Sequence, residues 1–185
     1  ARSLAMYYGV PWHGRRLARL YSAFVTPGAL CFDVGAHVGN RVRCWRRLGA
    51  RVIAIEPSRD CLAVLHRLYG RDPHLLTDPP AVGRRAGSAP LLISDATPTV
   101  TTLSATWVEQ VRHDPSFAGV AWRRGANVPV TTLEALIARH GMPSFVKIDI
   151  EGYEAEALAG LEHGVAALSF EYLPAARGIA HECIV

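Results

Sequence analysis

The sequence predicts an α/β fold in which helices cover both faces of a mostly parallel sheet. Short apolar runs alternate with longer amphipathic stretches along the chain, and Gly or Pro separates many of them. Strands that alternate with helices imply right-handed crossovers and a parallel sheet. Of the 185 residues, 50% are hydrophobic and 19% are charged. Because this length and composition suit one domain with a substantial core, we predict a single domain over residues 1–185.

The first half of the chain predicts three helices and two strands. Leu and aromatic side chains recur at helical spacing before Pro27-Gly28, so we expect an N-terminal helical segment over residues 1–26. Ser58 is placed to cap the third helix, since a serine hydroxyl accepts a hydrogen bond from the first turn. In chain order, the predicted elements are helix 14–24, strand 29–34, helix 40–48, strand 51–55 and a helix after Ser58 that carries Leu62, Leu65 and Leu68.

The second half is less regular. We expect an irregular insertion over residues 95–130 that covers the substrate, because long stretches without periodicity in a compact domain are usually functional. Residues 131–134 have the S/T-x-x-E form of a capping box, so Thr131 and Glu134 are expected to open a helix that ends at Gly141. The other predicted elements are strands near 78–83, 89–94, 144–150 and 165–172, a helix at 153–163 and a last helix beyond Pro174.

Charge is distributed unevenly in a chain whose formal net charge is +4. Residues 1–51 hold nine Arg against the lone acid Asp33, whereas residues 134–171 hold seven acids against Arg139 and Lys147. A basic half can attract an anionic substrate, a nucleic acid or an acidic carrier protein. The alternative is a solvated helix face in a protein with a GC-rich coding sequence, which the excess of Arg over Lys favours.

The cysteines and the hydropathy pattern exclude several classes. The four cysteines show neither CxxC nor Cys/His ligand spacing, so we expect buried free thiols and no metal site. No apolar run approaches the roughly 18 residues of a membrane helix, and the N-terminus shows no signal pattern. We therefore expect a soluble, cytoplasmic protein. Its oligomeric state is left open.

A glycine loop and a carboxylate indicate a cofactor that contains a nucleoside. The segment DVGAHVGN, residues 33–40, follows a predicted strand and leads into a helix, where glycines allow close approach of a ligand. Glu56 ends the next predicted strand and is placed to accept both hydroxyls of a ribose. The loop reads G-x-x-x-G instead of G-x-G-x-x-G, which disfavours an NAD-dependent oxidoreductase.

Five segments together resemble the FkbM family of S-adenosylmethionine-dependent methyltransferases. They are DVGAHVGN, IAIEPS, TTLEAL, VKIDIEGYE and LSFEY, and the resemblance covers roughly residues 27–172. It implies a Rossmann-like methyltransferase fold and O-methylation of a hydroxyl on a sugar, a glycan or a polyketide-type natural product. It also implies a last helix and an antiparallel pair of strands after the fifth parallel strand, and we expect these C-terminal strands to be missing from the sequence.

The resemblance also implies the residues that hold S-adenosylmethionine. By position, the loop residues face the methionine part, Glu56 with Pro57 holds the ribose, and Ala81 and Val82 lie near the adenine. His37 departs from the family, which usually has Asn there, and this adds a titrating group. The loop residues expected at the cofactor are Asp33, Gly35, Ala36, His37, Gly39 and Asn40.

Four residues are candidates for catalysis. Asp149, where cofactor and substrate are expected to meet, is the leading candidate for the base that takes the acceptor proton, with Glu151 and Glu171 as rivals. Lys147 precedes Asp149 by two positions, so both can point to one face of a strand. Its functional interpretation is orientation of Asp149 or of an acceptor that carries negative charge, and its structural one is an ion pair with an acid such as Glu154.

Three other functions stay open beside the methyltransferase. The His37 departure leaves room for a domain that binds S-adenosylmethionine without turnover. An NAD-dependent oxidoreductase would require the chain to bind NADH. The basic N-terminal region leaves a nucleic-acid methyltransferase open, although the sequence lacks the Asn/Asp-Pro-Pro-aromatic motif of base methylation.

Overall fold

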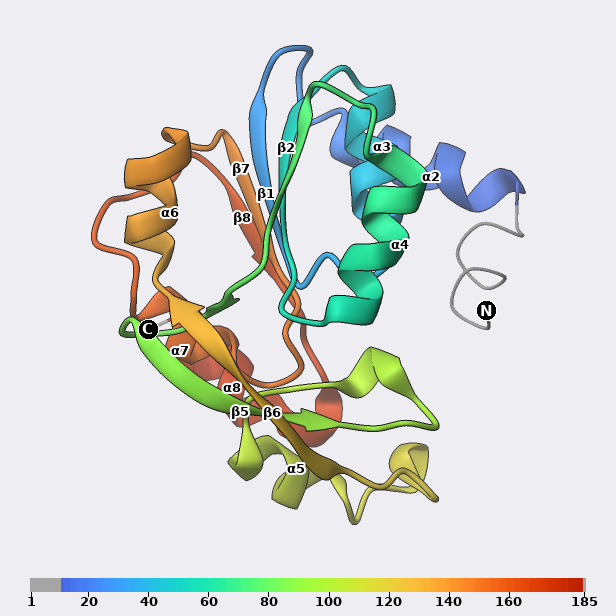
Figure 1. The fold of residues 1–185 in the computed structure, drawn as a ribbon, viewed down its shortest axis with the longest axis vertical. Coiled ribbons are helices and arrows are strands. Elements are labelled where there is room, and N and C mark those ends of the chain that lie inside the picture. The colour runs from blue at the N-terminus through green and yellow to red at the C-terminus, as the bar shows by residue number, and fades with distance from the viewer. Residues whose placement is uncertain (1–10, 185) are drawn as a thin grey trace.

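The computed structural model describes residues 11–184, which form a five-stranded parallel sheet with helices on both faces (Figure 1). All four strand pairs are parallel, as the sequence predicts. Residues 1–10 of the predicted N-terminal segment lie outside the described part. Across the sheet, the strands are β3 (Leu75–Asp78), β2 (Arg51–Ile55), β1 (Leu30–Val34), β7 (Phe145–Ile148) and β8 (Leu168–Phe170).

Two apolar clusters, one on each face of the sheet, hold the helices in place. The first face packs against α2 (Pro11–Tyr21), α3 (Asn40–Arg47) and α4 (Arg59–Tyr69), with Trp45 and Leu65 fully buried. The second packs against α6 (Leu133–His140) and α7 (Glu154–Leu158), with Leu136 fully buried. Successive side chains of a strand point to opposite faces, so the alternating apolar residues of β1 and β2 supply both clusters.

A second, smaller sheet lies beyond the carboxyl ends of the parallel strands (Figure 1). It contains β4 (Ala81–Val82), β5 (Gly87–Ile93) and β6 (Arg123–Thr131); β5 is antiparallel and β4 parallel to β6. The prediction of an irregular segment over 95–130 is wrong for β6, whose nine residues pair with a strand far away in sequence. Such pairing leaves little local pattern.

The chain between β5 and β6 folds around a small aromatic core. It forms η1 (Pro98–Val100), α5 (Ala105–Val111) and η2 (Pro115–Phe117). Trp107 is completely buried and meets Phe117 and Trp122 edge to face. These aromatic side chains therefore stabilise the insertion itself.

Several element ends differ from the predicted ones. The N-cap of α6 is Thr132, whose hydroxyl accepts from the Ala135 amide at 3.0 Å, so the cap lies one residue later than predicted and, with Ala135 at the third helical position, is not a capping box. Thr131 ends β6, and Glu134 bonds to His163. The predicted helix 153–163 shortens to α7, and the chain ends with η3 (Pro174–Ala176) and α8 (Arg177–Glu182). Ser58 caps α4 as predicted.

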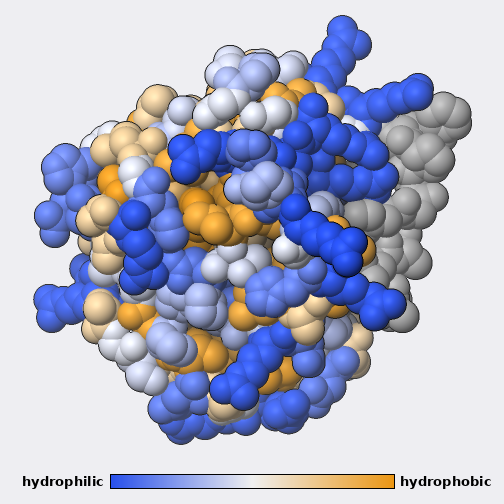
Figure 2. Space-filling view, turned by 45° about the horizontal axis from the view of Figure 1, so that its top comes forward, coloured by the Kyte–Doolittle hydropathy of each residue, from blue (hydrophilic) through white to orange (hydrophobic). Residues whose placement is uncertain are grey.

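The surface is mostly hydrophilic on the face drawn in Figure 2, with separate apolar patches between charged side chains. Leu20 and Phe24, which the helical pattern groups with the buried residues of the first helix, are 59% and 50% exposed. Cys31, Cys44, Cys61 and Cys183 are free, and the first three are buried. Among the described residues, no helix has the length and apolar character to cross a membrane.

Candidate functional site

A cleft lies between the carboxyl ends of β1, β2 and β7 and the smaller sheet. It encloses about 890 Å³, part of which is open to solvent. Its floor comes from the parallel strands and the loops after them, and its far wall comes from β4, β5 and the chain around η1. In open parallel α/β sheets, ligands bind outside the carboxyl ends of the strands, so this cleft is the candidate site.

The loop after β1 forms one side of the cleft and needs a glycine at its start. Gly35 has φ +76°, and its amide donates to the Ile55 carbonyl at 3.0 Å. A Cβ atom at Gly35 would lie 1.9 Å from the Asp149 carbonyl oxygen. The glycine is therefore required by the close approach of the loop to the end of β7.

Glu56 sits at the end of β2 with both carboxyl oxygens held. Its Oε2 accepts from the His37 amide at 2.8 Å, and its Oε1 accepts from the Ser58 amide at 2.8 Å. The residue is only 7% exposed, yet it lines the cleft. Burial raises the pKa of Glu56 to about 7, while the two amides oppose that rise. This carboxyl is thus fixed in direction and titrates near neutral pH.

Lys147 lies beneath the cleft in a buried ion-pair network. Its Nζ is 3.3 Å from Asp33 Oδ1, 3.0 Å from Asp149 Oδ2 and 3.3 Å from the Gly35 carbonyl. Burial lowers the pKa of Lys147, but Asp33 and Asp149 raise it by more, so Lys147 stays charged. Lys147 and Asp149 point the same way, as their spacing predicts. The expected alternative partner, Glu154, instead accepts from the Ile150 amide.

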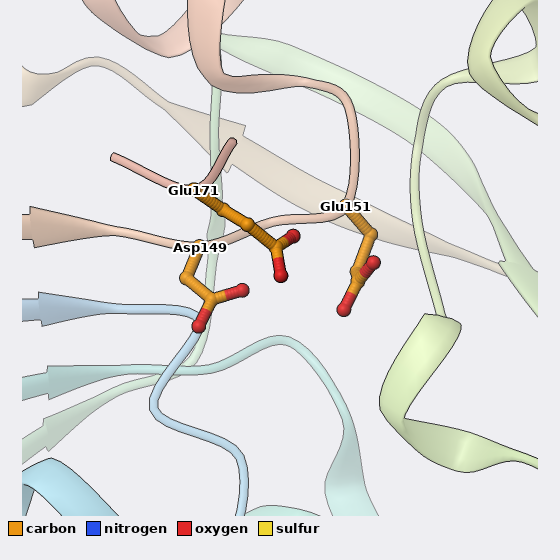
Figure 3. A group of neighbouring side chains, drawn as sticks. All are labelled: Asp149, Glu151 and Glu171. Carbon is orange, nitrogen blue, oxygen red and sulfur yellow. The ribbon is translucent and has the colours of Figure 1, made fainter. Parts of the chain in front are cut away.

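Three carboxyl groups gather at the ends of β7 and β8. Asp149, Glu151 and Glu171 each place one oxygen within 4.8 Å of the others, and the three point into the same space (Figure 3). Burial raises the pKa values of Glu151 and Glu171, and the neighbouring acids raise them further. This spacing allows a shared cation, and the absence of a metal stays a prediction.

The structure brings nine of the predicted site residues to the cleft and leaves five behind it. Asp33 and Lys147 lie under the floor, and Ala36 is buried against the first core cluster. At Gly39, a Cβ atom would meet Leu65 at 2.8 Å, so packing on α4 accounts for this glycine; Asn40 begins α3. The residues that line the cleft are Gly35, His37, Glu56, Pro57, Ala81, Val82, Asp149, Glu151 and Glu171.

Sequence reasoning missed most of the far wall. Five residues between Pro98 and Leu103, all but Val100, line the cleft, and so do Leu91 and Tyr153. The high threonine content was the available signal in the sequence. It indicates the segment but not which of its residues line the cleft. Thr99, Thr101 and Thr102 line the cleft, and the isolated bridge between Leu92 and Thr102 joins this run to β5.

Comparison of the sequence with models of known protein families identifies the family of this chain. The model of the methyltransferase FkbM domain matches residues 33–176. This chain belongs to the FkbM methyltransferase family. The match begins at the glycine loop and ends in η3, so the FkbM domain includes both walls of the cleft and the carboxyl cluster. No curated protein matches the chain.

Proposed function

We propose that this chain is an S-adenosylmethionine-dependent O-methyltransferase that acts on a hydroxyl of a sugar, a glycan or a polyketide-type natural product. The observation that carries the proposal is Glu56, a buried carboxyl that lines the cleft while two backbone amides fix its oxygens. A carboxylate at this strand end suits ribose hydroxyls. Membership of the FkbM family supports methyl transfer as the reaction.

The residues of the cleft fit a cofactor that contains a nucleoside. Glu56 would hold the ribose, and Ile55, Ala81 and Val82 offer an apolar wall for a purine. Gly35 and His37 of the loop after β1 line the cleft together with Asp149, where the methionine part of the cofactor would lie. S-adenosylmethionine, when bound, supplies an electrophilic methyl group on a sulfonium centre.

The chain's own work is to place the acceptor oxygen and to take its proton. We assign Asp149 as the base that takes this proton. Its side chain is 30% exposed, and Lys147 Nζ holds its Oδ2 at 3.0 Å. Burial and neighbouring acids raise the pKa values of Glu151 and Glu171. With a pKa of about 9, Glu151 is protonated at neutral pH and is suited to donate a hydrogen bond to the acceptor, whereas Glu171, with a pKa of about 7, stays the rival of Asp149 as the base.

The cleft favours an acceptor without negative charge. Four acids line it, namely Glu56, Asp149, Glu151 and Glu171, and its described lining contains neither Lys nor Arg. Among the described lining residues, His37 is the one with a basic side chain. Burial, together with the Lys147 charge, lowers the pKa of His37. An anionic acceptor would therefore meet no cation in the lining, and we revise the expected acceptor to a neutral or cationic polyol.

Asp149→Asn tests the assignment of the base. This substitution keeps the shape and removes the basic oxygen, so turnover should fall about a hundredfold or more while affinity for S-adenosylhomocysteine changes little. The assay follows labelled methyl from S-adenosylmethionine onto a panel of hydroxylated acceptors, with Glu151→Gln and Glu171→Gln in parallel. Near-native turnover by Asp149→Asn would reject this role. Binding of S-adenosylhomocysteine without methylation of any acceptor would favour a non-catalytic domain.

A further inference from the structure

The turn that carries Glu151 has an unusual backbone. Glu151 has φ +56° and Gly152 has φ +85°, two consecutive residues in the left-handed region. For a residue with a Cβ atom this region is strained, so surrounding contacts must hold Glu151 there. If Glu151 relaxed to a negative φ, its Cβ would point elsewhere and its carboxyl would leave Asp149 and Glu171.

Thr102 makes the contact that holds the carbonyl of this turn. Its hydroxyl donates to the Glu151 carbonyl at 2.7 Å, with a longer approach of 3.4 Å to the Ile150 carbonyl. The same oxygen accepts from the Ser104 amide at 2.9 Å, which sets the direction of the hydroxyl proton. Thr102 is 2% exposed, so water does not replace these bonds.

The backbone of Thr102 is itself anchored. Its amide donates to the Leu92 carbonyl at 3.0 Å and its carbonyl accepts from the Leu92 amide at 2.8 Å. Trp107 fills the space over Gly152, where a Cβ atom would lie 2.1 Å from the indole ring. The turn is thus clamped by residues of the 95–130 segment.

We propose that Thr102 is a positioning residue that keeps the Glu151 carboxyl beside Asp149 and Glu171 by fixing the Glu151 carbonyl. The hydrogen-bonded contact is between the insertion and the strand end, so the insertion does more than cover the cleft. It sets the geometry of one acid in the cluster. The relevance of this acid to an acceptor rests on the proposed function, whereas the contact itself does not.

The test compares Thr102→Val, which removes the hydroxyl at similar volume, with Thr102→Ser, which keeps it. The probe is the side-chain carboxyl carbon of Glu151, followed by NMR from acid to alkaline pH in the protein without cofactor and assigned with Glu151→Gln. In the wild type, burial raises the pKa of Glu151 most, the facing acids Glu171, Asp149 and Glu154 raise it further, and the charge of Lys147 opposes them. Thr131→Val removes another buried threonine hydroxyl and is the matched control.

We expect the pKa of Glu151 to stay well above its ordinary 4.5 in the wild type, Thr102→Ser and Thr131→Val, and to fall toward 4.5 in Thr102→Val. A purely structural role for Thr102 predicts a lower melting temperature with the Glu151 pKa unchanged, and that result would overturn the proposal. An ordinary Glu151 pKa in the wild type would overturn it too. If Thr102→Val does not fold, Thr102→Ala takes its place. Because no cofactor or acceptor is added, failure of the proposed function would leave this result intact.

Discussion

Glu56 shows how burial tunes a single binding group at the residue scale. Its pKa of about 7 means that the carboxyl changes charge across the neutral range. Below that pKa, a proton occupies one of the oxygens that would otherwise accept from ribose hydroxyls. The ionised form is the better acceptor, because hydrogen bonds to charged groups are the stronger ones. Cofactor affinity should therefore depend on pH.

We expect the affinity for S-adenosylhomocysteine to rise about tenfold between pH 6 and pH 8, as Glu56 loses its proton. Glu56→Gln should bind about tenfold more weakly than the wild type at pH 8 and should show no such rise. Calorimetric titrations at several pH values measure both effects. Glu171→Gln is the control, because Glu171 also has a raised pKa but lies at the acceptor end and should keep the rise. A pH-independent wild type would contradict the role of Glu56.

The backbone of His37 explains how this position can carry His where the FkbM family usually has Asn. It has φ +48°, a left-handed conformation in which Asn and His are both enriched. Its backbone amide, which donates to Glu56, makes the contact that the loop requires, and this amide is present with either side chain. Exchange of Asn for His thus preserves the loop, and the lowered pKa of His37 favours a neutral ring at pH 7.

At the scale of elements, the junction between the loop after β1 and the end of β7 is the tightest contact of the site. Gly35 and Asp149 come from different strands, and the sheet register sets their neighbours Asp33 and Lys147 side by side. Any side chain at Gly35 would push against the Asp149 backbone. The loop glycine therefore supports the acid end of the site as well as the cofactor end.

Gly35→Ala should destabilise the protein by clearly more than the roughly 1–2 kcal/mol of the left-handed backbone alone. Gly28→Ala is the matched control, because Gly28 has φ +81° but a Cβ atom there meets nothing within 4 Å. Urea denaturation of both variants gives the two losses in free energy of unfolding. Equal losses would show that the loop can move away from Asp149, and that the close approach does not constrain it.

Elements with a strong local pattern could be predicted, and those that depend on distant pairing could not. The strands β1 and β2 are short apolar runs with buried residues on both faces, so their sequence alone indicates a parallel sheet. In contrast, β6 carries Arg123, Arg124 and Pro129, and its strand character comes from pairing with β5. Thr131 and Thr132 are both suitable caps, and only the end of β6 decides between them.

At the scale of the whole molecule, the floor of the cleft could be predicted from the sequence, and most of its far wall could not. The floor residues Gly35, Glu56 and Asp149 end or follow predicted strands, so topology brings them together. The far wall around Thr102 approaches through contacts between residues that are far apart in sequence. The charge of the cleft also required the structure, because none of the described Arg residues in the first third of the chain lines it.

We propose that the cleft of this FkbM family member binds S-adenosylmethionine and not a dinucleotide. Calorimetric titration of the protein with S-adenosylhomocysteine, and separately with NADH, distinguishes the two. We expect one molecule of S-adenosylhomocysteine bound per chain and no measurable binding of NADH. Binding of NADH without affinity for S-adenosylhomocysteine would contradict it.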